Sequence, residues 1–345
     1  MDRFETVMDF FNGKAAGKLV WYLDWNKVVN IPANIKNDVE LLNDFGCSFV
    51  DGIGPSTVET DDPLVRIEQE QQGTKNIKRI ITPVGSLEYV SQHNHPVDYP
   101  VKTSKDCQTL KFLYDNRLLQ KKEFQFATSL HQINITGSSP VQQLLQWDTG
   151  MEHFYYLAAD YPEELQALLD SMHQVQIKRT SFACECNVPV IYQAENTSTT
   201  MISPYFYEKY SLPQIREQAQ IVHQCGKKFV IHMCGLLYDL LDLIKQTGID
   251  GIHSVTPPPV GNTPFEAVYE QFGDKFPIQG RFGSTQWHGL EVDEIRANLR
   301  KILSFEIVQS RPFILQVTAD GIAVDYKEIK KIQYIIDEVN KDRRI

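Results

Sequence analysis

Several features that would place this chain in a common class of protein are missing from its sequence. No stretch reaches the roughly 18 to 20 apolar residues that a membrane-spanning helix needs. The start, Met1 to Glu5, has no basic segment followed by an apolar run, so we expect a cytoplasmic protein. The formal net charge is -10 and no basic stripe offsets it. Nucleic acid and membrane surfaces are therefore not expected partners.

Cysteine is also scarce. Six cysteines are scattered over 345 residues, at positions 47, 107, 184, 186, 225 and 234. Without a secretory signal this distribution does not predict a disulfide framework, and reduced thiols are free to bind a metal. With 42% hydrophobic and 23% charged residues, the composition is that of a globular enzyme and excludes disordered and fibrous classes.

The common nucleotide and hydrolase motifs are absent as well. The sequence has no G-x-G-x-x-G after its first predicted strand, no Walker phosphate loop, no G-x-S-x-G elbow and no H-E-x-x-H. Nucleotide-driven and serine-hydrolase functions therefore lose their support.

What the sequence does contain is an alternation of short apolar runs with longer segments of helical periodicity, which is typical of parallel β/α units. Eight strands are predicted at Leu19–Leu23, Cys47–Val50, Phe126–Leu130, Val188–Tyr192, Lys228–His232, Gly251–Val255, Phe276–Gln279 and Phe313–Val317. Helices are predicted at Pro162–Lys178, Leu212–Cys225, Leu236–Gln246 and Val292–Leu303. Eight strands with helical crossovers predict an α/β protein, a single (β/α)8 TIM barrel.

Residues 78–90 differ from this alternation. They predict an antiparallel β-hairpin, turned near Pro83 to Ser86 and inserted after the second strand, where it covers part of the barrel mouth. No internal repeat or long Gly/Ser linker divides the chain. We therefore expect one domain over residues 1–345, with an N-terminal helical extension.

The strongest candidate site residues are His232 and Cys234. In TIM barrels the reacting groups lie at the C-terminal ends of the strands, and residues two apart on a strand point to one side. His232 and Cys234 end the fifth predicted strand, and imidazole and thiolate suit zinc. An H-x-C pair also arises by chance, as a half-buried histidine beside an inert core cysteine.

Further candidates follow the other strands. Glu195, His253, His288 and Asp320 stand at or after the fourth, sixth, seventh and eighth strands. Glu195 is equally explained as a capping or loop carboxylate, and Asp320 as a turn residue before Gly321.

An aromatic group closes the first strand. The group consists of Trp21, Tyr22, Asp24 and Trp25. We expect its rings either to line a pocket for an apolar ligand or to belong to the ordinary core. Two other pairs carry weaker signals: Cys184 and Cys186 fall on the opposite end of the predicted barrel, and His93 and His95 lie in a loop.

The chain resembles the uroporphyrinogen decarboxylase superfamily, and within it the zinc-dependent, corrinoid-linked methyltransferases. The segments that carry this resemblance are Tyr99–Thr103, Ser203–Phe206 with Leu212–Pro213, Gly226–Gly235, Gly248–Gly251 and Ile278–Gly280. The H-x-C-G element in the third of these segments is the most specific. The true decarboxylases have an Arg-rich segment after the first strand, whereas this chain has Leu23–Asn26 there. A polyanionic tetrapyrrole is therefore a poor fit.

The resemblance implies zinc ligands at His232 and Cys234. The family's third ligand is a cysteine after the eighth strand, where this chain has Asp320. Glu195 is then a ligand or general base, and His253 stands near a position where the branch carries a carboxylate. Tyr22, Asp24, Trp25 and His288 are the expected substrate-binding residues.

The function implied is a zinc-assisted transfer of a methyl group between a small substrate, such as a methoxylated aromatic, and cobalamin. Relatives receive the corrinoid from a separate carrier protein, which is the expected protein partner. Three other functions stay open: a methylcorrinoid:thiol or folate methyltransferase, a metal-free decarboxylase, and a barrel that only binds a ligand. A homodimer stays open as the oligomeric state.

Overall fold

The computed structural model describes residues 8–24, 27–47, 52–123 and 132–342. Its centre is an eight-stranded sheet in which every neighbouring pair is parallel, in the order β1-β15-β14-β13-β12-β11-β10-β3. The strands are β1 Val20–Asp24, β3 Gly52–Ile53, β10 Gln132–Asn134, β11 Val190–Ala194, β12 Lys228–His232, β13 Gly251–Val255, β14 Ile278–Phe282 and β15 Phe313–Thr318. The predicted α/β class with a curled parallel sheet is confirmed.

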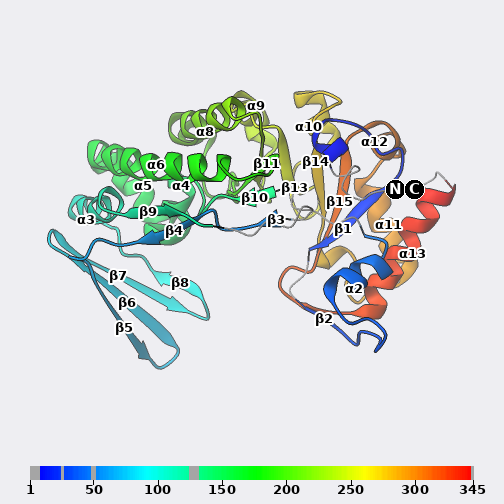
Figure 1. Cartoon of the computed structure of the whole chain (residues 1–345), viewed down its shortest axis with the longest axis horizontal. Helices are drawn as coiled ribbons and strands as arrows, with labels where there is room; N and C mark the ends of the chain where they lie inside the picture. The colour runs from blue at the N-terminus through cyan, green and yellow to red at the C-terminus, as the bar shows by residue number, and fades with distance from the viewer. Residues whose placement is uncertain (1–7, 25–26, 48–51, 124–131, 343–345) are drawn as a thin grey trace.

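Helices follow the strands and cover the outer face of the curled sheet (Figure 1). The longer ones are α3 Ser104–Asp115, α5 Gly150–Asp160, α6 Pro162–Cys184, α8 Leu212–Gln224, α10 Phe265–Phe272, α11 Val292–Ile302 and α13 Tyr326–Asp342. Shorter turns are α2 Asp38–Asp44, α4 Pro140–Gln143, η1 Leu144–Asp148, α7 Pro204–Phe206, η2 Tyr207–Ser211, η3 Tyr238–Leu240, α9 Leu241–Gln246, η4 Ser284–Gln286 and α12 Phe305–Ser310. None of the helices in the described ranges is long and apolar enough to cross a membrane.

The core has two parts because a buried parallel strand places side chains on both faces. The larger part lies between the strands and the surrounding helices. The smaller part fills the concave side of the sheet, where Val20, Val190, Val230 and Ile314 contact one another. Phe10 and Phe11, from the helical turn at residues 8–11, pack against this inner cluster. The inner surface is thus apolar at the N-terminal ends of the strands.

Three small sheets are added to this body. β2 Lys27–Val29 pairs with β16 Ala323–Asp325, and β4 Thr57–Thr60 pairs with β9 Leu118–Lys121. β5 Arg66–Gln72, β6 Lys75–Thr82, β7 Gly85–Gln92 and β8 His95–Asp98 form an antiparallel sheet. The predicted hairpin is confirmed as β6 and β7, and it is the centre of a larger four-stranded unit.

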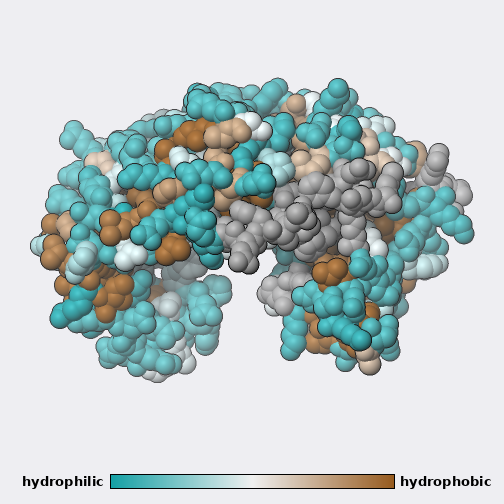
Figure 2. Space-filling view, viewed as in Figure 1, coloured by the Kyte–Doolittle hydropathy of each residue, from teal (hydrophilic) through white to brown (hydrophobic). Residues whose placement is uncertain are grey.

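The four-stranded sheet lies to one side of the strand ends (Figure 1). β2 and β16 follow the C-terminal ends of β1 and β15 and lie at the lower right of the same view. Figure 2 shows the surface hollowed along its lower edge between these two parts. The antiparallel sheet therefore flanks the hollow at the C-terminal ends of the strands.

Most predicted strands and helices are confirmed to within a few residues. β12 and β13 match their predicted bounds, and α6 begins at the predicted Pro162 but continues six residues beyond Lys178, to Cys184. The predicted second strand falls partly, and the third wholly, outside the described residues. In the described ranges no pairing joins β1 to β3, so closure into a complete barrel stays a prediction.

Candidate functional site

On the concave face of the sheet, the apolar inner cluster is followed by polar side chains toward the C-terminal ends of the strands. Because alternate residues share a face, the residues that follow Val20, Val190 and Val230 on the inner side are Tyr22, Tyr192 and His232. β13 contributes His253 next to His232, and β14 and β15 contribute Arg281 opposite Gln316. Six strands thus bring polar groups into one region of the concave surface.

His253 lies at the centre of a hydrogen-bonded chain. Its Nε2 is 2.6 Å from the hydroxyl of Tyr22, and its Nδ1 is 2.7 Å from Nδ1 of His232. The hydroxyl of Tyr192 lies 3.5 Å from the same Nδ1. If Tyr22 donates to Nε2, then His253 donates from Nδ1 to His232, and each neutral ring needs only one proton. The contacts connect β1, β12 and β13, although β1 and β13 are not neighbours in the sheet.

Burial sets the charge of this chain. Burial, together with the nearby guanidinium of Arg281, lowers the pKa of His232 to about 4. The pKa of His253 lies well below its ordinary value because of burial and because of His232. Burial raises the pKa of both phenols, Tyr192 and Tyr22, above the ordinary value. At neutral pH both imidazoles are uncharged and both phenols keep their protons.

Cys234 stands just beyond β12, half-buried, with its thiol 3.6 Å from the amide oxygen of Asn196. Burial raises the pKa of the thiol. The backbone N–H groups of Glu195 and Asn196 donate to the carbonyl of His232, so the loop after β11 is fixed against the end of β12.

The glycine of the H-x-C-G element has a steric role. A Cβ on Gly235 would stand 2.3 Å from Cβ of Ser198 and 2.4 Å from the carbonyl oxygen of Thr197. The loop after β11 therefore approaches this backbone more closely than any side chain permits.

Glu195 does not join the histidines. Ser139 donates to its carboxylate from the backbone N–H, at 2.8 Å, and from its hydroxyl, and Gln193 donates at 3.2 Å. Burial raises the pKa of Glu195 to about 7 although these hydrogen bonds oppose the rise. Gln193 belongs to a network with Gln176 and Gln218 on the helical side of the sheet. The structure thus places the Glu195 carboxylate behind the strands.

Asp320 is held by other side chains. Arg281 donates to one carboxylate oxygen at 2.5 Å, and Ser284 donates to the other from its backbone N–H and its hydroxyl, both at 2.7 Å. Burial opposes ionisation of Asp320, but the hydrogen bonds from Ser284 and Arg281 outweigh it and lower the pKa. Asp320 adopts φ 51° before Gly321, as expected of a turn residue.

The predicted substrate-binding residues are divided. Tyr22 lies at the centre of the site, and Asp24 accepts a hydrogen bond of 2.8 Å from Gln316. His288 is exposed and pairs with Glu328 of α13 at 3.1 Å, outside the histidine chain. Trp25 lies outside the described residues.

Sequence reasoning missed Tyr192, Arg281 and Gln316. Their signal was present in the inner-face alternation of β11, β14 and β15, once the register of the sheet is known. The side-chain carbonyl oxygen of Gln316, a residue only 1% exposed, has no hydrogen-bond partner within the described part of the chain. A buried acceptor without a partner is costly, and a bound substrate can satisfy it.

The three predicted metal ligands do not come together as one binding site in this structure. Within the described ranges, no three or more His, Cys, Asp or Glu side chains are grouped so that they could hold a metal ion. His232 ends β12 and Cys234 follows two residues later, whereas the carboxylate of Asp320 is held in an ion pair with Arg281.

Residues 143–341 match the family model described as Uroporphyrinogen decarboxylase (URO-D). Among solved structures, a methyltransferase from Methanosarcina mazei is similar with a TM-score of 0.58 and 14% identity, over 97% of this chain and 98% of that chain. D-psicose 3-epimerase from Clostridium cellulolyticum H10 gives a TM-score of 0.33 and 12% identity, over 70% of this chain and 85% of that chain. No curated protein sequence matches the chain. The likeness to the methyltransferase concerns the fold.

Proposed function

The chain belongs to the uroporphyrinogen decarboxylase (URO-D) family, and from this premise we propose that it is a methyltransferase whose substrate binds on the concave side of the sheet. The observation that carries the proposal is the chain of neutral groups Tyr22–His253–His232 beside Cys234. The same fold in a methyltransferase from Methanosarcina mazei supports it.

Zinc is part of this proposal, and the donor chemistry of two residues fits it. His232 is a neutral imidazole, the form that binds a metal, and Cys234 supplies sulfur two residues later. His253 offers a further nitrogen beside His232. Asp320 fits less well, because Arg281 and Ser284 already occupy both of its oxygens. When bound, zinc would supply a Lewis acid for the heteroatom that gains or loses the methyl group.

The chain's own residues then bind and orient the substrate. The rings of Tyr22 and Tyr192 and the apolar cluster below them suit a small aromatic substrate. The hydroxyl of Tyr22 holds a proton next to His253, from which a leaving heteroatom can be protonated. Arg281 holds a positive charge near His232. We propose that a methoxylated aromatic donates its methyl group to a corrinoid delivered by a separate carrier protein, which enters through the hollow.

A decarboxylase is the second candidate. The half-buried guanidinium of Arg281 favours it, since a cation beside a neutral histidine suits a substrate carboxylate. This alternative needs neither metal nor corrinoid.

The deciding experiment measures zinc content and methyl transfer in protein purified anaerobically without chelator. Wild type is compared with Cys234→Ala and, as the matched control at the other predicted ligand, Asp320→Asn. We expect about one zinc per chain in wild type, a large loss in Cys234→Ala, and retention in Asp320→Asn. Transfer is followed by the absorbance of reduced cobalamin with methoxylated aromatics.

Zinc absent from wild type even after it is supplied, together with decarboxylation that needs no corrinoid, would replace the methyltransferase by the second candidate. Loss of zinc from Asp320→Asn with retention in Cys234→Ala would move the metal to the Asp320 side of the site.

A further inference from the structure

A second candidate binding site lies on the antiparallel sheet, away from the histidines. Near its turn, this sheet buries Ile80 of β6 opposite Leu87 of β7, and β7 packs against α3. On the same face the next pair is Lys78 with Tyr89, because alternate residues share a face. The face therefore changes from apolar to polar as it extends beyond α3.

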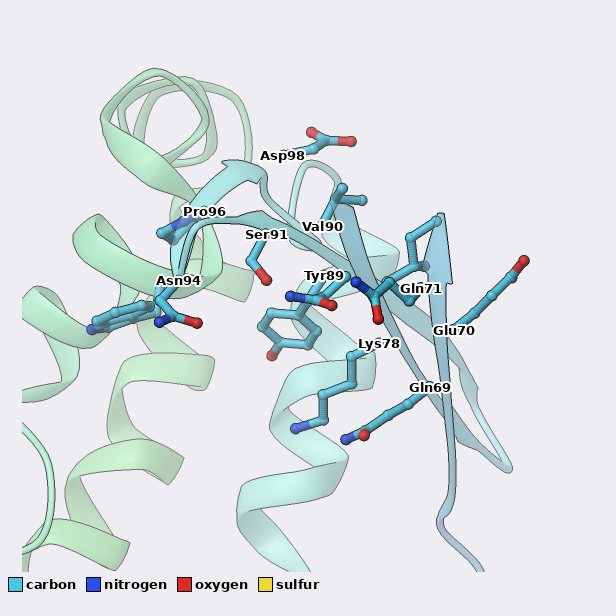
Figure 3. A pocket seen from close by; sticks show the side chains of 13 residues that line it. Gln69, Glu70, Gln71, Lys78, Tyr89, Val90, Ser91, Asn94, Pro96 and Asp98 are labelled. Carbon is cyan, nitrogen blue, oxygen red and sulfur yellow. The ribbon is translucent and has the colours of Figure 1, made fainter. Parts of the chain in front are cut away.

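Apart from Lys78, the polar half of this face carries uncharged side chains. Gln69 lies opposite Lys78, and Gln71 lies opposite Asn76. Within the described residues, the side chains of Gln69 and Asn76 form no hydrogen bonds. Figure 3 shows Lys78 extending beside the ring of Tyr89, and Gln69 extending toward the end of Lys78. Amide groups that are free to donate and accept are thus collected on one surface.

A cavity of about 610 Å³ lies over this surface. Its wall is completed by residues of β7, β8 and their turn, among them Ser91 and Asn94, and by Trp147 of η1. The volume is in the range of pockets for small ligands. Among the described residues, none on the inner face of the parallel sheet lines this cavity, which is therefore separate from the site around His253.

Two aromatic rings are fixed at the cavity. Trp147 is 46% exposed, while the next residue, Asp148, is buried and accepts a hydrogen bond of 2.9 Å from the hydroxyl of Tyr89. This bond joins η1 to β7, so the rings of Trp147 and Tyr89 are positioned by the same contact. A π-helical turn such as η1 is uncommon and often occurs at functional sites. An exposed indole at a cavity offers an apolar face with a donor at its edge.

The charges at the cavity do not form an anion site. Of the described residues that line the cavity, Lys78 alone is a cation, and its ammonium lies 5.7 Å from the centre of the Tyr89 ring. Glu70 and Asp98 bring negative charge, and Asp98 pairs with Lys102 at 2.6 Å. A phosphate or carboxylate would face more acids than bases here. An uncharged ligand suits this lining.

We propose that this cavity binds a neutral saccharide. A sugar ring has apolar C–H faces that stack on Trp147 or Tyr89, and hydroxyl groups that both donate to and accept from amides such as Gln69 and Asn76. The lining combines these two requirements.

The test uses the full chain and a panel of neutral mono- and disaccharides, observed by saturation-transfer NMR and titrated by calorimetry. The matched anionic probes are the corresponding sugar phosphates. We expect at least one neutral sugar to bind with a Kd of about 1 mM or tighter, and Trp147→Ala to weaken binding at least about tenfold. Tyr334→Ala removes a comparably exposed aromatic on α13 and should leave binding unchanged.

Absence of binding by every neutral sugar would overturn the proposal, and so would binding that Trp147→Ala leaves intact. Tighter binding of the phosphates than of the neutral sugars would assign the cavity to an anion. To separate these results from misfolding, Gln69→Ala, an exposed surface change, should weaken binding without a shift in Tm. Neither variant touches the site around His253, so zinc content reports independently on the methyltransferase proposal.

Discussion

At the scale of single residues, the chemistry of this protein depends on which polar groups are buried without charge. His232 and His253 are neutral because burial disfavours their cationic forms. Glu195 is buried behind the strands with Ser139, where its ionised form is also disfavoured. Burial therefore keeps the histidines in the neutral form, which can bind a metal or share a proton. The same effect makes the ionised form of Glu195 destabilising for the fold.

Glu195 predicts a dependence of stability on pH. Its pKa is about 7 in the fold and 4.5 in the unfolded chain, so folding favours the protonated form. Below about pH 4.5 the group contributes nothing, and stability falls as pH rises to about 7, by a total of about 3 kcal/mol. Glu195→Gln should lose this fall in urea unfolding at pH 5 and pH 8. Glu163→Gln, on the exposed start of α6, is the control; equal slopes in both variants would contradict the assignment.

Gly235 predicts a steric effect. Alanine there must displace Ser198 or the carbonyl of Thr197, so Gly235→Ala should reduce the free energy of unfolding by about 1 to 3 kcal/mol. If zinc binds at the end of β12 as proposed, the variant should also lose it, because the displaced loop is hydrogen-bonded to that strand end. Chemical denaturation and elemental analysis measure the two effects. Wild-type stability in the variant would show that the loop moves freely.

At the scale of elements, polar contacts attach the small sheets to the body. Arg179 of α6 donates to both carboxylate oxygens of Glu59 in β4, at 2.7 and 2.8 Å, and to Gln176 at 2.9 Å. Burial opposes the charge of Glu59, but Arg179 outweighs it and lowers the pKa. This two-bond ion pair, largely shielded from water, joins β4 and β9 to the longest helix.

Arg179→Ala should therefore destabilise the protein by about 1.5 to 3 kcal/mol, because it removes two charge-assisted hydrogen bonds from a mostly buried carboxylate and leaves Arg117, at 3.2 Å, as a cation beside it. The matched control is Arg66→Ala on β5, whose ion pair with Glu68 is exposed, and we expect a change of less than about 1 kcal/mol there. Thermal and urea unfolding measure both. Similar losses in the two variants would mean that the Arg179 pair is solvated.

At the scale of the whole molecule, the curled sheet brings distant parts of the chain together. Tyr22 and His253 are separated by 231 positions and by two intervening strands, yet their side chains are in hydrogen-bond contact across the concave surface. If the proposed methyl transfer uses this contact, Tyr22→Phe removes the proton next to His253 while keeping the ring.

Tyr22→Phe should lower kcat about 100-fold or more with little change in KM. His253 should still bond His232, which the ring ¹⁵N shifts of the histidines can establish. Tyr192→Phe, whose hydroxyl lies farther from His253 at 3.5 Å, is the comparison and should have the smaller effect. An unchanged kcat in Tyr22→Phe would remove the hydroxyl from the mechanism.

The sequence by itself determined the parts that depend on local pattern. Apolar runs located the strands, as at β12 and β13, and the hairpin at β6 and β7 followed from its alternation and turn residues. The motif around His232 and Cys234 pointed to one strand end, and the family membership it suggested is confirmed. These signals are local because strand formation and turn formation depend on neighbouring residues.

Only the tertiary structure decided how the candidates are combined. In the folded sheet Glu195 points toward the helices and Tyr22 points toward His253. Arg281 of β14 forms an ion pair with the carboxylate of Asp320. A strand pattern gives alternating faces but does not say which face is concave or which side chains meet across it. Those contacts depend on strand order and register, which arise from long-range packing of the whole chain.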